Sequence, residues 1–175
     1  MVDDGRDGDL APDVLDLARD VVGLLRERGE VLGTAESLTG GLLSGAVTSV
    51  PGSSAAYAGG LVTYATPLKV RLLGVPESLV AEHGVVSAEC ARAMAVGARE
   101  RTGADWALAT TGVAGPDRQE GHPAGTVHVG LAGPEGTVAT RLLDLPGDRG
   151  AVRASTVREA LALLREVLLS ANAGP

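Results

Sequence analysis

Short apolar runs alternate with longer stretches of helical periodicity along this chain, and that alternation restricts the fold more than any other feature. The runs at 31–35, 57–64 and 105–111 have the length of buried strands. Two more, 126–131 and 137–143, flank a glycine-rich turn and predict a hairpin. Between and around them the spacing predicts helices at 13–28, 42–50, 67–73, 76–82, 88–101 and from 148 to about 169. This order predicts an α/β fold, a single-domain three-layer α/β/α sandwich with a mixed sheet.

The chain has 175 residues, enough for one domain that buries roughly 70% of its unfolded surface. Residues 1–12 include four aspartates, and we expect an acidic, disordered leader before a folded domain at 13–172. The N-terminus lacks a basic stretch followed by an apolar run, and the sequence has no apolar stretch of about 20 residues. We therefore expect a cytoplasmic protein that does not enter a membrane.

Charge and composition exclude several kinds of partner. The net charge is −7 and only 2% of residues are aromatic, so nucleic acid is not an expected partner. An anionic small molecule would have to be bound by local arginines and backbone N–H groups against the overall field. The single cysteine, Cys90, rules out an internal disulfide and a multi-cysteine metal site, and we expect it in the core.

Only one of the fifteen basic side chains, Lys69, is a lysine. Guanidinium stays protonated at any working pH, so a site that needs an amine able to lose its proton cannot use arginine. Lys69 is therefore a candidate general base or Schiff-base amine. The alternative is a surface lysine that remains by chance in an arginine-rich chain.

Ser37 stands where a predicted strand ends and a helix begins, just before Gly40 and Gly41. Backbone N–H groups at such a turn point outward and suit an oxyanion or a phosphate. The serine hydroxyl is then a candidate nucleophile, or else an ordinary helix N-cap. The glycine spacing differs from the dinucleotide-binding fingerprint.

A nucleophilic serine needs a base, and the sequence gives no histidine an evident carboxylate partner. The three candidates sit at a helix end, in a polar loop and within a strand: His83, His122 and His128. A Ser-His-Asp triad is therefore not predicted.

Lys69 is the other possible base, provided that burial or a neighbouring cation lowers its pKa from about 10.4. Arg71 lies two residues away, although a helix would direct it elsewhere. Tyr64 is a candidate to relay a proton or to orient the amine.

Two further segments have the character of ligand loops. Thr111 and Gly112 end a predicted strand, where open α/β sheets bind ligands. Arg149 opens the last helix, followed by Arg153, and is a candidate to hold a phosphate in a forked geometry. The alternative is that Asp148 caps this helix and both arginines are solvated.

Six motifs in register resemble one family, the C-terminal domain of the competence/damage-inducible protein CinA. The resemblance covers about residues 13–170 and rests on 34–41 (TAESLTGG), 63–75 (TY…K…LGV), 84–87 (GVVS), 111–116 (TGVAGP), 123–127 (PAGTV) and 147–153 (GDR…VR).

The resemblance implies hydrolysis of the carboxamide of nicotinamide mononucleotide to nicotinate mononucleotide and ammonia. It implies a Ser-Lys amidase without metal or cofactor, with the pair falling on Ser37 and Lys69 and the family's tyrosine on Tyr64. Thr111 and Arg149 fall on positions expected to line the substrate site. Our own hypothesis adds that Arg149, with Arg153, binds the nucleotide phosphate, and that N–H groups of Thr39, Gly40 and Gly41, or of Gly112, hold the oxyanion. Homo-oligomers are also expected.

Departures from the family pattern concern the substrate more than the catalytic pair. Leu38 replaces a cysteine common after the serine. The loop Asp117–Pro123 lacks the usual Gly-Gly, and His122 stands where the family often has lysine. Two alternatives therefore stay open: an amidase for a different carboxamide, or a catalytically silent nucleotide-binding module.

Overall fold

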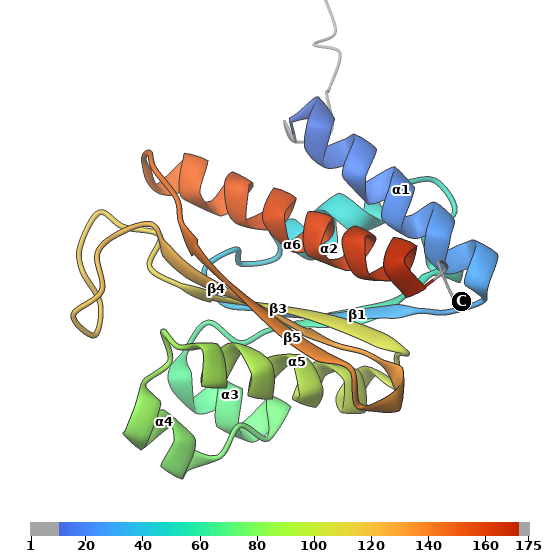
Figure 1. Cartoon of the computed structure of the whole chain (residues 1–175). Coiled ribbons are helices and arrows are strands. Elements are labelled where there is room, and N and C mark those ends of the chain that lie inside the picture. Colours follow the sequence, from blue (N-terminus) through green and yellow to red (C-terminus); the bar gives the residue numbers. More distant parts are fainter. Residues whose placement is uncertain (1–10, 172–175) are drawn as a thin grey trace, which may run out of the picture.

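Five strands form one mixed sheet at the centre of the molecule (Figure 1). The computed structural model describes residues 11–171. β1 pairs in parallel with β2 and β3, whereas β4 runs antiparallel to both β3 and β5. The strand order is β2-β1-β3-β4-β5, with bounds β1 Leu32–Glu36, β2 Tyr57–Val62, β3 Trp106–Gly112, β4 Thr126–Ala132 and β5 Val138–Asp144. The predicted mixed sheet is confirmed.

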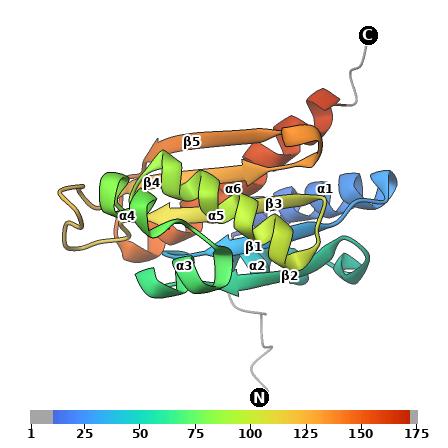
Figure 2. The same ribbon diagram turned by 90° about the horizontal axis from the view of Figure 1, so that it is seen from below.

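Helices cover both faces of the sheet, as the three-layer prediction requires (Figures 1 and 2). One face carries α1 (Pro12–Arg28), α2 (Leu42–Thr48) and α6 (Arg149–Ala171). The other carries α3 (Thr66–Leu73), α4 (Glu77–His83) and α5 (Ala88–Thr102). Short 3-10 turns occur at Ser53–Ala55 and Pro134–Gly136.

The predicted element ends lie within one or two residues of the observed ones. Most of the predicted leader, residues 1–10, lies outside the described residues, and Pro12 already begins α1. None of the helices that the structure describes is both long and apolar enough to cross a membrane.

The two faces of the sheet have different cores. Leu32, Trp106 and Leu108 point to the side of α1, α2 and α6, into a cluster of large aliphatic side chains. The opposite face of the same strands presents alanines, such as Ala107 and Ala109, to α5. Small side chains allow α5 to lie close to the sheet, and a Cβ built at Gly130 of β4 would lie 2.2 Å from the carbonyl oxygen of Ala91 in α5.

α3 packs equally closely on α5 at Gly97. A Cβ built there would lie 1.9 Å from the carbonyl oxygen of Leu73, the last residue of α3. Only glycine permits this approach. The contact fixes α3, and with it Lys69, relative to the sheet.

The parallel strands β1, β2 and β3 all end at one edge of the molecule, where open α/β sheets bind ligands. Ser37 follows β1, Thr63 and Tyr64 follow β2, and the loop 113–125 follows β3. α6 begins at the same edge (Figure 1). The topology thereby gathers the predicted site residues from distant parts of the sequence.

Candidate active site

The hydroxyl of Ser37, in the turn after β1, does not cap α2. The first turn of α2 is capped instead by the carboxylate of Glu36, which accepts hydrogen bonds from the N–H groups of Gly41 (2.9 Å), Leu43 (3.0 Å) and Ser44 (2.8 Å). The N-cap alternative for Ser37 is therefore wrong. Its hydroxyl faces a pocket rather than the helix end.

Glu36 is the residue of this region that sequence reasoning missed. It is fully buried, and the Ser44 hydroxyl also donates to its Oε1. Tyr57 Oη then donates to Ser44 Oγ at 2.8 Å, which extends the network away from Ser37. The missed signal was that Gly41, which precedes α2, has no side chain to cap the helix, so the first amides needed an acceptor from elsewhere.

The structure does not place Thr39, Gly40 or Gly41 in the pocket wall. The Gly40 N–H donates to the carbonyl of Ser37 at 3.1 Å, and that of Gly41 is held by Glu36. The hydroxyl of Thr39 pairs with that of Thr110 at 2.8 Å. These groups build the turn that presents Ser37.

Lys69 lies beneath Ser37, with only 1% of its side chain exposed. Its Nζ donates to Ser37 Oγ at 3.0 Å, to the carbonyl of Thr63 at 2.7 Å and to that of Tyr64 at 3.4 Å. Burial lowers the pKa of this amine; Cys90 and Glu120 nearby oppose the shift, with smaller effects. No carboxylate within residues 11–171 forms an ion pair with it.

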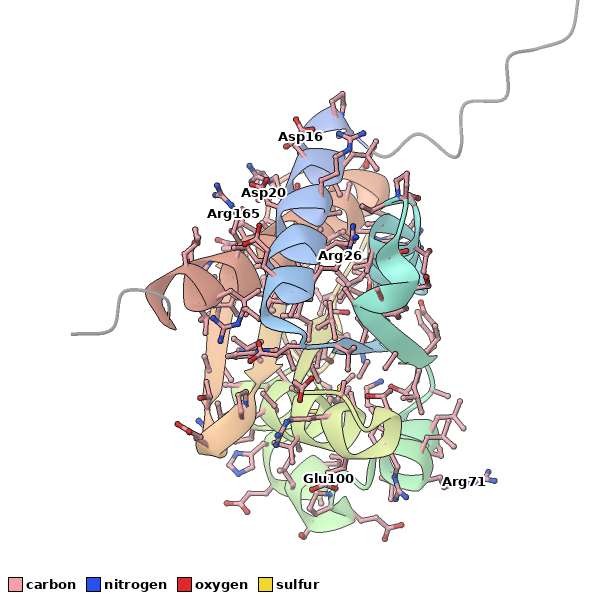
Figure 3. The ribbon with its side chains drawn as sticks, turned by 90° about the vertical axis from the view of Figure 1, so that its right-hand side faces the viewer. Asp16, Asp20, Arg26, Arg71, Glu100 and Arg165 are labelled. Atoms are coloured by element: carbon pink, nitrogen blue, oxygen red, sulfur yellow. The ribbon has the colours of Figure 1, made fainter. Side chains whose placement is uncertain are left out.

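Arg71 is not the cation that depresses this pKa. Its side chain extends from α3 into solvent, as the helix geometry predicted (Figure 3). Burial of the amine supplies the shift instead.

Tyr64 contacts the amine through its backbone. Its hydroxyl, at the end of a side chain that is 59% exposed, accepts a hydrogen bond from Arg149 Nη2 at 2.9 Å. Its carbonyl is the part that accepts from Lys69. The arrangement orients the amine and gives the phenol no direct path to it.

A pocket of about 390 Å³ opens over Ser37 and Lys69, a volume within the range of small-molecule sites. Thr111 and Gly112 line it, and Thr111 Oγ1 donates to the carbonyl of Val85 at 2.6 Å. The remaining wall comes from Leu38, Tyr64, Thr66, Val85, Val113, Ala114, Gly115, Asp117, Arg118, Gln119 and Arg149.

The two arginines of α6 have different positions. Arg149 lines the pocket and donates from Nη1 to the carbonyl of Gly115 at 2.9 Å. Arg153 instead donates to the carbonyls of Leu38 and Thr39, both at 3.0 Å, and fastens α6 to the Ser37 turn without lining the pocket. Asp148 accepts from the N–H of Ala151, so it caps α6 as the alternative reading predicted.

None of the histidines or the cysteine lines the pocket. His128 lies in a strand, as predicted; it is half-buried in β4, and burial lowers its pKa. Cys90 lies in the core, where burial raises the pKa of the thiol to about 11. Within the part of the chain that the structure describes, no three His, Cys, Asp or Glu side chains are grouped to hold a metal ion.

Comparison with known proteins identifies this architecture. The family model described as the CinA C-terminal domain matches residues 14–168. A "CinA-like protein" of Frankia casuarinae is 57% identical over 148 residues, 85% of this chain and 34% of that protein. A "putative competence-damage inducible protein" of Limosilactobacillus fermentum is 48% identical over 87% of this chain and 37% of its own length.

Solved structures give the same answer. The competence/damage inducible protein CihA from Agrobacterium tumefaciens superposes with a TM-score of 0.88 at 36% identity, covering 93% of this chain and 99% of that one. A CinA superfamily protein from Klebsiella pneumoniae gives 0.87 at 38% identity, over 90% and 98%. This chain spans about a third of the length of the curated relatives it matches, but nearly the whole of these solved structures. By sequence and by fold, the chain belongs to the CinA C-terminal domain family.

Proposed function

We propose that this protein hydrolyses the carboxamide of nicotinamide mononucleotide, releasing ammonia and nicotinate mononucleotide, with Ser37 as nucleophile and Lys69 as general base. The observation that carries the proposal is the 3.0 Å contact between Lys69 Nζ and Ser37 Oγ at the floor of the pocket. Family membership supports the same reaction, since the family resemblance implied a Ser-Lys amidase.

The surroundings of Lys69 suit a neutral amine. A neutral amine has two N–H donors and one lone pair. In that state the carbonyls of Thr63 and Tyr64 accept both N–H donors of Nζ. The 3.0 Å contact with Ser37 then reverses, and the hydroxyl donates to the lone pair instead of accepting from the amine. Burial, with no carboxylate paired to the amine, lowers its pKa and favours this state.

In the first half of the reaction, Ser37 Oγ attacks the carboxamide carbon while Lys69 takes the hydroxyl proton. The tetrahedral intermediate collapses as Lys69 returns that proton to the nitrogen, and the C–N bond breaks to release ammonia. In the second half, Lys69 takes a proton from water, which attacks the ester on Ser37. The acid product leaves as the proton returns to Ser37 Oγ.

The N–H group of Leu38 is our candidate donor to the oxyanion. Leu38 follows the nucleophile and lines the pocket, and its N–H has no hydrogen-bond partner within residues 11–171. An N–H at the position after the nucleophile serves this purpose in other strand-turn-helix serine hydrolases. The sequence-based candidates Gly40 and Gly41 are already committed to the turn.

Ammonia release from nicotinamide mononucleotide tests the proposal. We expect turnover by the wild type and none by Ser37→Ala, with a panel of other carboxamides as the comparison. Saturable binding without ammonia release would favour the silent binding module. Faster release from another amide would favour an amidase of different specificity.

A further inference from the structure

Two arginines from distant segments line the mouth of the pocket. Arg149 begins α6, and Arg118 lies in the loop between β3 and β4. The chain as a whole carries a net charge of −7, so two guanidinium groups at one small pocket run against the overall charge. Such a pairing favours an anionic ligand group.

Neither guanidinium is neutralised by a carboxylate of the described residues. Within residues 11–171, neither Arg118 nor Arg149 forms an ion pair. Arg118 makes one hydrogen bond, from Nη2 to the carbonyl of Gly121, and Arg149 makes two. Because a guanidinium has five N–H donors, both retain donors for a ligand.

Neither acidic side chain of the loop, Glu120 or Asp117, is paired with Arg118 within the described residues. The carboxylate of Glu120 accepts hydrogen bonds from the N–H groups of Val85 (3.1 Å) and Val86 (2.9 Å). Glu120 is thus held on the segment between α4 and α5 and is not paired with Arg118. Asp117 lines the pocket but forms no ion pair in the described part of the chain.

The hydrogen bonds from Val85 and Val86 to the Glu120 carboxylate also hold the loop in place. Glu120 (φ 51°) and Gly121 (φ 81°) form a tight turn closed by backbone hydrogen bonds between Gln119 and His122. A positive φ is unfavourable for glutamate. The two amides bound by its carboxylate offset that cost, so the turn is anchored and Arg118 is presented at the pocket wall rather than on a free loop.

We propose that Arg118 and Arg149 together form a phosphate clasp, which binds the 5′-phosphate of the substrate and makes the pocket select a nucleotide over the corresponding nucleoside. This inference rests on the proposed function, because it assigns a subsite to that substrate. Because Arg118 would contact the phosphate and not the reacting amide, the clasp makes it a specificity-determining residue of this protein.

Arg118→Gln tests the clasp, assayed on nicotinamide mononucleotide and on nicotinamide riboside, which has the same amide and ribose but no phosphate. We expect KM for the mononucleotide to rise about tenfold or more with kcat nearly unchanged, as loss of a charge-assisted hydrogen bond predicts. KM for the riboside should stay the same. Arg71→Gln removes an equal charge outside the pocket and should change neither value.

Two results would overturn the clasp: an unchanged KM for the mononucleotide, or an equal rise for both substrates, which a displaced loop would produce. If the wild type hydrolyses neither substrate, the proposed function fails. The clasp is then tested separately, by measuring how tightly ribose 5-phosphate binds to the wild type and to Arg118→Gln. Weaker binding to Arg118→Gln than to the wild type would support it. Equal binding, or none to the wild type, would reject it.

Discussion

The floor and the mouth of the pocket are built in opposite ways. At the floor, Ser37 and Lys69 are buried, with Glu36 buried behind the Ser37 turn, and the hydrogen bonds of Glu36 and Lys69 go to groups of the fold itself. At the mouth, Arg118 and Arg149 are exposed and keep donors that no group of the described residues uses.

This difference separates two tasks. The floor stands at the ends of parallel strands, so the fold itself fixes the Ser-Lys pair. The mouth is formed by a loop and the first turn of a helix, where sequence changes cost little stability. We infer that the floor determines the reaction and the mouth determines the substrate.

The largest effect is expected from removing the base at the floor. Lys69→Arg and Lys69→Met should each lower kcat/KM for the mononucleotide by about a thousandfold or more, because neither side chain can take a proton from Ser37. Met is the control for size, since arginine is longer than the buried site requires. Turnover near that of the wild type in either variant would contradict the base assignment; circular dichroism checks that each is folded.

Glu36→Gln should cost about 2–4 kcal/mol in the free energy of unfolding, because an amide cannot accept from all the N–H groups that the buried carboxylate holds. Denaturant titration measures the change. Glu27→Gln, on the exposed side of α1, is the matched control and should stay within about 0.5 kcal/mol of the wild type. Equal effects of the two substitutions would show that Glu36 is not what holds the Ser37 turn.

Gly97→Ala should destabilise the protein by about 1–3 kcal/mol, because the added methyl group meets the carbonyl of Leu73 and pushes α3 away from α5. Activity should fall as well, since α3 carries Lys69. Gly23→Ala, in α1 with no atom within 4 Å of the new Cβ, should instead stabilise by about 0.5–1 kcal/mol. Thermal unfolding of both variants gives the sign; a neutral Gly97→Ala would mean that α3 is not fixed by this contact.

The smallest effect is expected at the mouth, from Tyr64→Phe. This change removes the hydroxyl that accepts from Arg149 but keeps the carbonyl that accepts from Lys69. We expect kcat/KM to fall less than about tenfold, because one exposed hydrogen bond contributes little free energy. Steady-state kinetics would show a loss of about a thousandfold if the phenol relayed a proton. Tyr64 would then belong with Ser37 and Lys69 among the residues that determine the reaction.

The spacing of apolar residues was sufficient to predict the strands and helices, because each of them buries a face that its own sequence encodes. The lone lysine and the serine turn were also evident in the sequence. That they meet across 32 positions depends on the order of the strands, and the family resemblance supplied that information.

The sequence could not show which polar groups are already occupied. Arg153 carries the same chemistry as Arg149, yet its donors are used by the carbonyls of Leu38 and Thr39. Gly41 has the N–H that an oxyanion needs, but Glu36 holds it. Arg118 and Glu120 depend on how one loop folds back on a distant segment. These assignments require three-dimensional contacts.

The most direct test of the account is the pKa of Lys69 itself. Because the chain has one lysine, a protein labelled with ¹³C,¹⁵N-lysine gives a single side-chain signal, which can be followed by NMR across a pH titration. Burial lowers the pKa of this amine from its ordinary value of 10.5, so the signal should titrate below that pH. The rate of ammonia release should rise with pH through the same midpoint, since only the neutral amine accepts the proton of Ser37. A midpoint at or above 10.5 would contradict the account, because Lys69 would then be a fixed cation.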